Sequence, residues 1–371
     1  MIRKNISCII GTRPEAIKMA PIIRALNQHP NLFNIRVIAT AQHRQMLDQV
    51  LSLFNIRPDL DMDLMRPDQS LLDVTQRVLR AMGDLLENQR PDLVMAEGDT
   101  TTVMATSVSC FYAGVPFAHV EAGLRTGDPR LPYPEEFNRR IVALTARLHF
   151  APTQRARSNL LREGIPDDHI WVTGNTVIDS LVEVLRRGIA PTSALPNRPY
   201  VLMTCHRRES FGEAVREVFE TIRDVAARHP DLLFWYPVHP NTNVAVPARE
   251  ILASSANVLL SEPLDYLTFV NAMSNARLLI SDSGGVQEEA TFLGKPTLVL
   301  RDVTERPEAV DEGPCILVGT RRRQIETHIE TLLADPVAYS RAARQSAVFG
   351  NGHAAELIAS HMQDLVRTGG L

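Results

Sequence analysis

Several of the sequence signatures that announce a cofactor or a metal are absent from this chain. It contains no GxGxxG fingerprint of a dinucleotide fold, no GxxxxGK[ST] phosphate loop and no HExxH zinc helix. Its 371 residues include only four cysteines, which are widely spaced and form no CxxC pair. We therefore expect neither a cofactor nor a bound metal, and the scattered thiols suit the reducing cytoplasm better than a disulfide framework.

Blocks of one charge sign and long apolar runs are also scarce. The 39 basic and 43 acidic side chains give a net charge of −4, with one short run of like charge at Arg321 to Arg323. Such a distribution offers no basic patch for nucleic acid or for a membrane surface. The stretch 100–120 has no formally charged side chain, but Gly114 and Pro116 interrupt it, so we expect a helix, a turn and a strand there. The first apolar run ends at Gly11, too early for a secretory signal.

What the chain does contain is a regular alternation of short β-branched or apolar runs with helical periodicity. This βαβ order predicts an α/β fold whose parallel sheets are covered on both faces. The expected strands are 6–10, 35–39, 93–97, 115–120, 200–204, 232–236, 258–260, 278–281 and 297–300.

A proline-containing segment at 188–199 interrupts this alternation, which indicates two Rossmann-like doubly wound domains. We expect the N-terminal domain at 1–175 and the C-terminal domain at 176–353. Apolar residues at helical spacing predict a last helix within 354–371, which must dock somewhere and is expected to pack back on the first domain.

Polar clusters follow several of the predicted strands, at the position where ligands bind in open parallel sheets. After the first strand comes GTRPEAIK, in which Pro14 suits the first turn of a helix. Arg13 and Lys18 add positive charge to the free N–H groups of that helix start. The segment is therefore a hypothetical anion site, although solvated charges at an ordinary helix start explain it equally well.

Three carboxylates follow later strands of the same half. Asp99 lies in GDTTT, Glu121 in EAGLRTGD and Glu135 in PYPEEFNRR. Carboxyl groups that converge on one sheet edge can share protons, because proximity and partial burial keep some protonated and others ionised. Each has a simpler explanation alone, Asp99 as a helix cap and Glu135 as a favourable charge in a first turn. Their joint presence favours acid/base chemistry.

The second half carries cationic and glycine-rich loops at the equivalent places. His206 to Arg208 follow one strand, and Ser283 to Gly285 begin a helix whose N–H groups can bind phosphate. Glu289, one turn into that helix, is placed to accept ribose hydroxyls, and Arg306 precedes Pro307 at another expected helix start. Three such loops in one domain predict a diphosphate ligand.

The order of these motifs along the chain is as informative as their content. GTRPEAIKMAP, TAQHRQMLDQV, GDTTT, HVEAGLRTGD, TGNTVID, HRRESFG, DSGGVQEEA and TERPEAV follow one another between residue 11 and residue 310. In content and order they resemble the bacterial, non-hydrolysing UDP-N-acetylglucosamine 2-epimerase family. The resemblance covers most of the chain and is far more specific than a single glycine loop.

The resemblance implies a GT-B-like pair of Rossmann domains with UDP-N-acetylglucosamine in the cleft between them, no metal or nicotinamide, and a homodimer. It also implies roles for individual residues, with His206 serving both binding and chemistry and with Lys18, Asp99 and Glu121 contacting the sugar. The positions that match nucleotide contacts are Arg13, His206, Phe269, Ser283, Gly284, Gly285, Glu289 and Arg306. Those that match the sugar chemistry are Lys18, Asp99, Glu121 and Glu135.

The reaction that the family implies accounts for this combination of groups. The C2 proton of N-acetylglucosamine lies next to no carbonyl, so simple deprotonation would leave an unstabilised carbanion. Loss of that proton together with UDP from C1 gives 2-acetamidoglucal, and re-addition with protonation on the opposite face gives UDP-N-acetylmannosamine, a precursor of surface polysaccharides. A carboxylate base, a carboxylic acid and cationic stabilisation of UDP are what this path requires.

Two departures from the family pattern stand near the expected nucleotide site. Cys205 occupies a position where a small residue such as Gly or Ala is common, and its modest size suits that place. Leu264 stands where some members have Gln, which bears on uracil recognition.

The resemblance also points to regulation by a second molecule of UDP-N-acetylglucosamine, bound beside the active site as an activator. Gln42, Gln45, Arg207 and His239 match the positions associated with that site. Asp68 replaces a basic residue that some of those enzymes carry.

Other functions remain open on the same residues. The alternatives are an epimerase of a modified UDP-diacetamido sugar, a hydrolysing epimerase that releases N-acetylmannosamine, and a glycosyltransferase of the same fold. A catalytically silent UDP-sugar sensor would need the phosphate loops but not the carboxylates, so Asp99, Glu121 and Glu135 together weigh against it.

Overall fold

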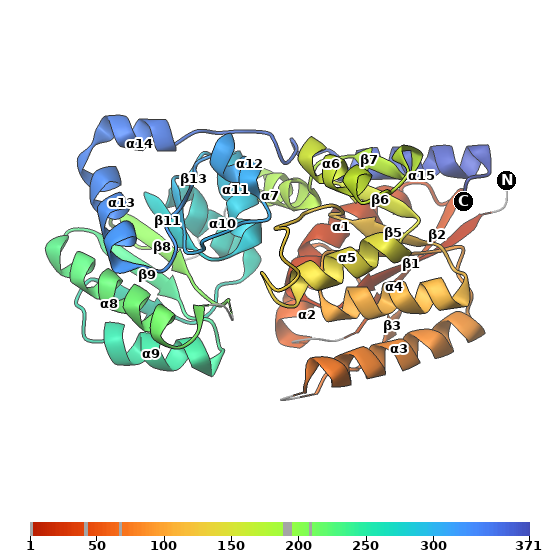
Figure 1. Ribbon diagram of the computed structural model, residues 1–371, viewed down its shortest axis with the longest axis horizontal. Helices are drawn as coiled ribbons and strands as arrows, with labels where there is room; N and C mark the ends of the chain where they lie inside the picture. Colours follow the sequence, from red (N-terminus) through yellow and green to blue (C-terminus); the bar gives the residue numbers. More distant parts are fainter. Residues whose placement is uncertain (1–2, 41–43, 67–68, 188–194, 208–209) are drawn as a thin grey trace. The chain divides into compact units, whose positions relative to one another are not determined.

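The computed structural model describes residues 3–40, 44–66, 69–187, 195–207 and 210–371 of the chain. They belong to two compact units, one formed by 1–182 together with 350–371 and the other by 183–349 (Figure 1). In the part of the chain so described, no helix combines the length and the apolarity that crossing a membrane requires.

The first unit is built on a seven-stranded sheet with strand order β3-β2-β1-β4-β5-β6-β7, and all its paired strands are parallel. Its strands are β1 (Lys4–Ile10), β2 (Phe33–Ala39), β3 (Leu60–Asp61), β4 (Leu93–Glu97), β5 (Phe117–Val120), β6 (Leu148–Ala151) and β7 (Ile170–Val172). Its helices are α1 (Arg13–Asn27), α2 (Arg44–Leu53), α3 (Leu71–Asn88), α4 (Thr101–Ala113), α5 (Glu135–Thr145), α6 (Gln154–Arg162), the short 3₁₀ helix η1 (Asp167–His169), α15 (Ala354–Thr368) and α7 (Thr176–Arg186), whose last residues, from Glu183, belong to the second unit.

The second unit is built on a six-stranded parallel sheet with strand order β10-β9-β8-β11-β12-β13. Its strands are β8 (Tyr200–Thr204), β9 (Leu233–Pro237), β10 (Val258–Ser261), β11 (Leu278–Ser281), β12 (Thr297–Val299) and β13 (Cys315–Leu317). Its helices are α8 (Glu213–Arg228), α9 (Thr242–Leu252), α10 (Tyr266–Asn275), α11 (Gly284–Leu293), α12 (Pro307–Asp311), α13 (Arg322–Ala334) and α14 (Pro336–Ala342).

The parallel α/β fold predicted from the alternating pattern is confirmed in both units, and every expected strand overlaps an observed one. The pattern did not single out β3, β6, β7 and β13, which are two, four, three and three residues long. Runs this short are too brief to establish a period of two, so they carry little signal.

In both sheets, the strand that comes first in the chain lies in the interior of the sheet, and later strands lie on both sides of it. In the first, β1 lies between β2 and β4, and in the second, β8 lies between β9 and β11. At such a switch point, the loops after the two central strands lead away to opposite sides and leave room for a ligand. The residues after β1, β4, β8 and β11 are therefore the ones that the fold exposes for chemistry.

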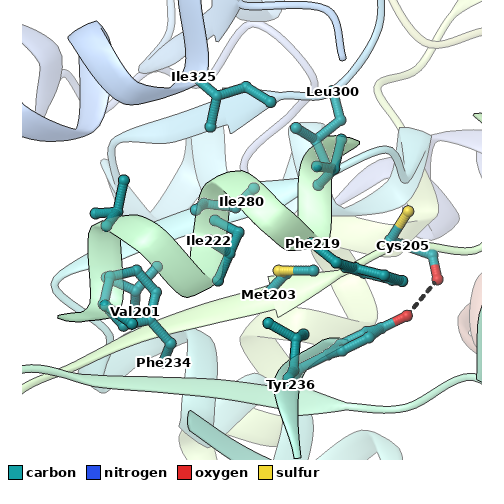
Figure 2. Close-up of a cluster of buried hydrophobic side chains, with 14 of the residues drawn as sticks. Val201, Met203, Cys205, Phe219, Ile222, Phe234, Tyr236, Ile280, Leu300 and Ile325 are labelled. Atoms are coloured by element: carbon teal, nitrogen blue, oxygen red, sulfur yellow. Dashed lines mark hydrogen bonds between the residues drawn. The ribbon is translucent and has the colours of Figure 1, made fainter. Parts of the chain in front are cut away.

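The second sheet buries one face under α8, α9 and α13. Phe219 and Ile222 of α8 lie over Met203 and Tyr236 of the sheet (Figure 2). Each such side chain contributes about 1.5–3 kcal/mol when it is removed from water. The Tyr236 hydroxyl also donates to the backbone carbonyl of Cys205 at 2.9 Å, which ties the loop after β8 to this core.

The C-terminal helix belongs to the first unit, where α15 packs against α1. Its start is held by Asp179 of α7, which accepts the N–H groups of Ala354 at 3.2 Å and Ala355 at 2.8 Å. A carboxylate suits this place, because the first N–H groups of a helix lack partners within the helix.

Candidate functional site

The start of α1 places two cationic residues beside the end of β1. Thr12 caps the helix and receives the N–H of Glu15 at 3.4 Å, while the Glu15 carboxylate accepts the N–H groups of Thr12 at 3.1 Å and Gly11 at 2.5 Å. This capping box fixes the first turn. Arg13, the first helical residue, is half-buried, and Lys18, one turn further on, is buried. Lys18 therefore points into protein rather than into solvent.

A buried cluster of charges surrounds the Lys18 ammonium. Its Nζ donates to Glu97 Oε1 at 2.8 Å and also to the carboxylate of Glu121. Glu121 in turn accepts from Asn175 Nδ2 at 2.6 Å. All four residues are buried, with at most 7% of each exposed. One ammonium group thus joins two carboxylates that water barely reaches.

The backbone of Glu121 is strained. Its φ is +64°, in the left-handed region that L-residues other than glycine and asparagine rarely enter. Such a conformation costs roughly 1–2 kcal/mol and persists only where surrounding contacts hold it. Here the bonds from Lys18 and Asn175 supply those contacts, and strain of this kind at a polar residue is typical of functional sites.

Asp99 lies in the loop after β4 and does not cap α4, since Thr100 is the N-cap and receives the N–H of Val103. The helix-cap explanation for Asp99 is therefore wrong. Its carboxylate instead accepts from Arg139 Nη2 at 2.5 Å. Because Glu97 is in register with Val120 on β5, Asp99 and Glu121 follow neighbouring strand ends.

Glu135 occupies the first turn of α5, as the simpler explanation from the sequence expects, and it is half-buried. The neighbouring Glu136 is fully buried and accepts the N–H groups of Thr126 at 3.1 Å and Gly127 at 3.3 Å. Arg139 joins this carboxylate, at 3.3 Å, to Asp99. Helix α5 therefore orients the Asp99 carboxylate and carries Glu135 at its own beginning.

Burial dominates the protonation of the first unit's cluster. It raises the pKa of Glu97 well above its ordinary value; the Lys18 ammonium opposes this shift and the nearby Glu121 charge adds to it. Burial likewise raises the pKa of Glu15, against the N–H groups of Gly11 and Thr12 that favour its ionised form. A carboxyl group in such surroundings can hold a proton near neutral pH, which is the property that acid/base chemistry uses.

The loop after β8 presents His206 to the buried carboxylate of Asp282, the residue that follows β11. His206 Nδ1 lies 3.0 Å from Asp282 Oδ1, and Asp282 Oδ2 accepts the backbone N–H groups of His206 at 2.7 Å and Arg207 at 2.8 Å. Burial alone would raise the pKa of Asp282, yet the imidazole and these N–H groups hold it below its ordinary value. His206 also stacks on His239, with ring centroids 5.5 Å apart. This arrangement fixes the ring and leaves Nε2 for a ligand.

The first turn of α11 is shaped by a buried arginine. Ser283 is the N-cap and Gly284 the first helical residue. Arg306 Nε donates to Glu288 Oε1 at 2.6 Å, and its Nη1 pairs with Glu305. A Cβ on Gly284 would lie 2.4 Å from Arg306 Nη1, so only glycine leaves room for the guanidinium there. Arg306 consequently borders the N–H groups at the start of α11.

Two further residues that the resemblance singles out lie on α10 and α11. The buried Glu289 carboxylate accepts the hydroxyl of Tyr266, the first residue of α10, at 2.7 Å. Phe269, also on α10, is half-buried, and Leu264 just before that helix is half-buried as well. The Tyr266 hydroxyl thus fixes one oxygen of the group expected to meet ribose.

The residues expected to form a regulatory site are described in part. Gln42 and Asp68 lie outside the described residues, as does the side chain of Gln45. Arg207 donates its backbone N–H to Asp282, and His239 stacks on His206, so both lie beside the histidine predicted to act in catalysis. Among the described side chains, no cluster of three or more His, Cys, Asp or Glu could hold a metal ion.

Sequence reasoning missed several residues of this arrangement, namely Glu97, Arg139, Asn175, Tyr266 and Asp282. Arg139, Asn175 and Asp282 lie inside PYPEEFNRR, TGNTVID and SDSGGVQEEA, and Glu97 directly precedes GDTTT, whereas Tyr266 lies outside these motifs. For Glu97 and Asp282 the available signal was the charge itself, since a carboxylate at the end of a buried strand is costly unless it has a partner.

Two parallel α/β units, each with polar loops at its switch point, define a GT-B-like enzyme. A family model for UDP-N-acetylglucosamine 2-epimerase matches residues 24–363. The chain belongs to this family. It is 48% identical to UDP-N-acetylglucosamine 2-epimerase of Yersinia pestis over 361 residues, which cover 94% of this chain and 96% of that protein. The Escherichia coli K12 enzyme of the same name is 47% identical over 361 residues, with the same coverage of 94% and 96%.

Solved structures agree with the sequence relatives. The crystal structure of UDP-GlcNAc 2-epimerase from Neisseria meningitidis bound to UDP-GlcNAc superposes with a TM-score of 0.93 at 44% identity, covering 97% of this chain and 100% of that one. The Methanocaldococcus jannaschii enzyme in complex with UDP-GlcNAc and UDP has a TM-score of 0.88 at 33% identity, covering 97% and 99%. The resemblance of the motifs to UDP-N-acetylglucosamine 2-epimerases is therefore confirmed.

Proposed function

We propose that this protein interconverts UDP-N-acetylglucosamine and UDP-N-acetylmannosamine without a cofactor, by eliminating UDP and adding it back. The observation that carries the proposal is the buried cluster of Lys18, Glu97 and Glu121, next to the strand end that bears Asp99. Relatives in complex with UDP-GlcNAc, and in one case with UDP as well, support the choice of substrate and of leaving group.

The carboxylates of the first unit would handle the proton at C2. Removal of that proton with departure of UDP avoids a free carbanion, and protonation of the glucal intermediate from the opposite face inverts C2. One carboxyl group must be ionised and another protonated at the same pH, and buried Glu121 and half-buried Asp99 and Glu135 offer the different surroundings that such a division requires. Lys18 would keep Glu121 in place and neutralise its charge.

The loops of the second unit would hold UDP while the sugar reacts. The free N–H groups at the start of α11, beside Ser283 and Gly284, suit a diphosphate. His206, oriented through Nδ1 by Asp282, would donate from Nε2 to the departing phosphate. Arg13, Phe269, Gly285, Glu289 and Arg306 complete the expected nucleotide contacts.

We further propose that the protein works in the cytoplasm as a homodimer, as the family resemblance implies. Cys8, Cys110, Cys205 and Cys315 are all buried and free, which fits a reducing compartment.

Arg207 and His239, next to His206, support a second nucleotide sugar as activator. In that case UDP-N-acetylmannosamine alone should react slowly until traces of its epimer are added, and hyperbolic reverse kinetics without a lag would contradict the activator.

The test of the main proposal is incubation of the pure protein with UDP-N-acetylglucosamine and EDTA, with the products followed by NMR. We expect UDP-N-acetylmannosamine to accumulate to a constant ratio, and the same ratio when the reaction starts from the product. Release of free N-acetylmannosamine in step with UDP would identify a hydrolysing epimerase instead. Unchanged substrate would refute the proposal.

A further inference from the structure

Glu97 is the one carboxylate of the buried cluster to which neither the motifs nor the family resemblance gives a role. It is the last residue of β4, and only 2% of it is exposed. Strand β4 lies between β1, which leads into α1, and β5, which leads to Glu121. Glu97 therefore stands between the helix that carries Lys18 and the strained turn that carries Glu121.

The Lys18 side chain needs a second anchor to reach Glu121 in a single geometry. A lysine has a flexible four-carbon stem and three N–H donors, so one ion pair leaves its ammonium several orientations. Here Nζ is bound on two sides, by Glu97 Oε1 at 2.8 Å and by the Glu121 carboxylate. We propose that Glu97 is a positioning residue of the epimerisation, which holds the Lys18 ammonium against Glu121 and so fixes the direction and charge of that carboxylate. The inference rests on the function proposed above.

The charges that face Glu97 specify which group holds the extra proton. Helix α1 contributes Lys18 and Glu15, the turn after β5 contributes Glu121, and His119 on β5 contacts the backbone carbonyl of Gly98 at 2.8 Å. Burial lowers the pKa of His119 to about 4, so this ring adds no positive charge at neutral pH.

Lys18 carries one positive charge and meets two carboxylates, so a proton on Glu97 reduces the repulsion between Glu97 and Glu121. The raised pKa of Glu97 agrees with this assignment. Protonated Glu97 still accepts from Lys18 through its carbonyl oxygen, so Lys18 and Glu121 remain as one neutral ion pair.

Two substitutions distinguish the role of Glu97 as a hydrogen-bond acceptor for Lys18 from the role of its ionisable carboxyl group. Glu97→Leu removes the acceptor at similar volume, whereas Glu97→Gln keeps a carbonyl oxygen but can never ionise. Met95→Leu is the matched control, since Met95 is buried two residues earlier on the same face of β4 and lies outside the charge cluster.

We expect Glu97→Leu to lower kcat about tenfold to hundredfold, the usual consequence of losing one hydrogen bond to a charged group, with KM changed less than about threefold. The conservative Glu97→Gln should restore kcat at neutral pH to within about threefold of the parent. We expect the kcat of the parent to fall at alkaline pH as Glu97 ionises, and the kcat of Glu97→Gln to lack this fall. A Glu97→Leu enzyme with parental kcat, or a Glu97→Gln enzyme that is as slow as Glu97→Leu or keeps the parental pH profile, would overturn the proposal.

A second readout does not depend on activity. Because the pKa of Glu97 is raised in the folded protein, the parent binds an extra proton when folded and loses stability as pH rises from about 5 towards that raised pKa. The free energy of unfolding in urea should therefore increase for Glu97→Gln, relative to the parent, as pH rises from about 5 to 8. A difference that stays constant with pH would refute the protonated Glu97. An inactive parent that still shows the shift would refute the proposed reaction and leave the assignment of Glu97 standing.

Discussion

The two units share one strand order around their switch points but fill them with opposite chemistry. At the ends of β4 and β5, the first unit gathers two carboxylates around one buried ammonium, that of Lys18 on the helix after β1. After β8 and β11, the second unit gathers an imidazole and backbone N–H groups around one buried carboxylate, Asp282. The fold therefore determines where a ligand can bind, while the loop residues determine the chemistry at that place.

Two carboxylates at equivalent places in the two sheets show that the surrounding groups determine the direction in which a buried pKa shifts. Glu97 ends β4, and Asp282 follows β11, and both are buried. Burial raises the pKa of Glu97, which faces another carboxylate across Lys18. Burial has the same tendency at Asp282, but the donors around it reverse the shift and hold its pKa below the ordinary value. One site is suited to keeping a proton and the other to keeping a negative charge.

The largest expected effect lies in the first unit. Glu121→Gln should lower kcat by about 10²–10⁴ with KM within a few-fold of the parent, because proton transfer acts in the transition state. Steady-state kinetics with UDP-N-acetylglucosamine measure both constants. Glu163→Gln is the control, since the exposed Glu163 carboxylate at the C-terminal end of α6 forms an ion pair with Arg125 and lies outside the buried cluster. If KM rose and kcat held, Glu121 would belong to binding, and the contrast between the units would fail.

An intermediate effect is expected in the second unit, on binding. Gly284→Ala places a Cβ 2.4 Å from Arg306 Nη1 and must displace that side chain from the first turn of α11. We expect the Kd for UDP to rise roughly tenfold, or about 1.4 kcal/mol. Titration calorimetry should show no such rise for Gly83→Ala on α3, a helical glycine outside the expected nucleotide contacts whose Cβ meets no atom within 4 Å. Equal losses in the two variants would mean that Arg306 does not shape the anion site.

The smallest effect is a difference in the pH dependence of stability. The pKa of Asp282 is lowered in the folded protein, so its stabilisation is present above the unfolded value and is lost as pH falls. Asp282→Asn should be less stable than the parent near neutral pH, and this deficit should shrink by roughly 0.5–1 kcal/mol between about pH 5 and pH 3.5. For Glu97→Gln, urea unfolding should show a stability relative to the parent that increases as pH rises, over a higher pH range than for Asp282→Asn. If the stability differences of both variants from the parent changed with pH in the same direction and over the same pH range, the proposed electrostatic difference between the two units would be wrong.

The sequence predicts local features of this molecule better than long-range partners. Strand–helix alternation predicted both sheets, and GTRPEAIK predicted a helix start that the capping box of Thr12 and Glu15 now explains. The contact between Lys18 and Glu97 joins residues 79 positions apart, and that between His206 and Asp282 spans 76. No local pattern encodes such pairs, because strand order decides which strand ends become neighbours.

The strain at Glu121 could not be read from the sequence either. Its φ of +64° occurs at an ordinary glutamate, whereas a glycine there would have signalled a left-handed turn. Motif order placed Glu121 among the residues of the sugar chemistry, but only the structure adds that its backbone is held in an unfavourable conformation by Lys18 and Asn175.

The central claim is that carboxyl groups of the first unit remove the C2 proton while the second unit holds UDP, and solvent exchange at C2 tests it most directly. A carboxyl group that receives this proton exchanges it with water during turnover. In heavy water, UDP-N-acetylmannosamine should therefore carry deuterium at C2 by NMR and mass spectrometry, and long incubation should release some UDP and 2-acetamidoglucal. UDP-N-acetylmannosamine that forms in heavy water with its C2 hydrogen fully retained would contradict the account, even though the protein would still be an epimerase.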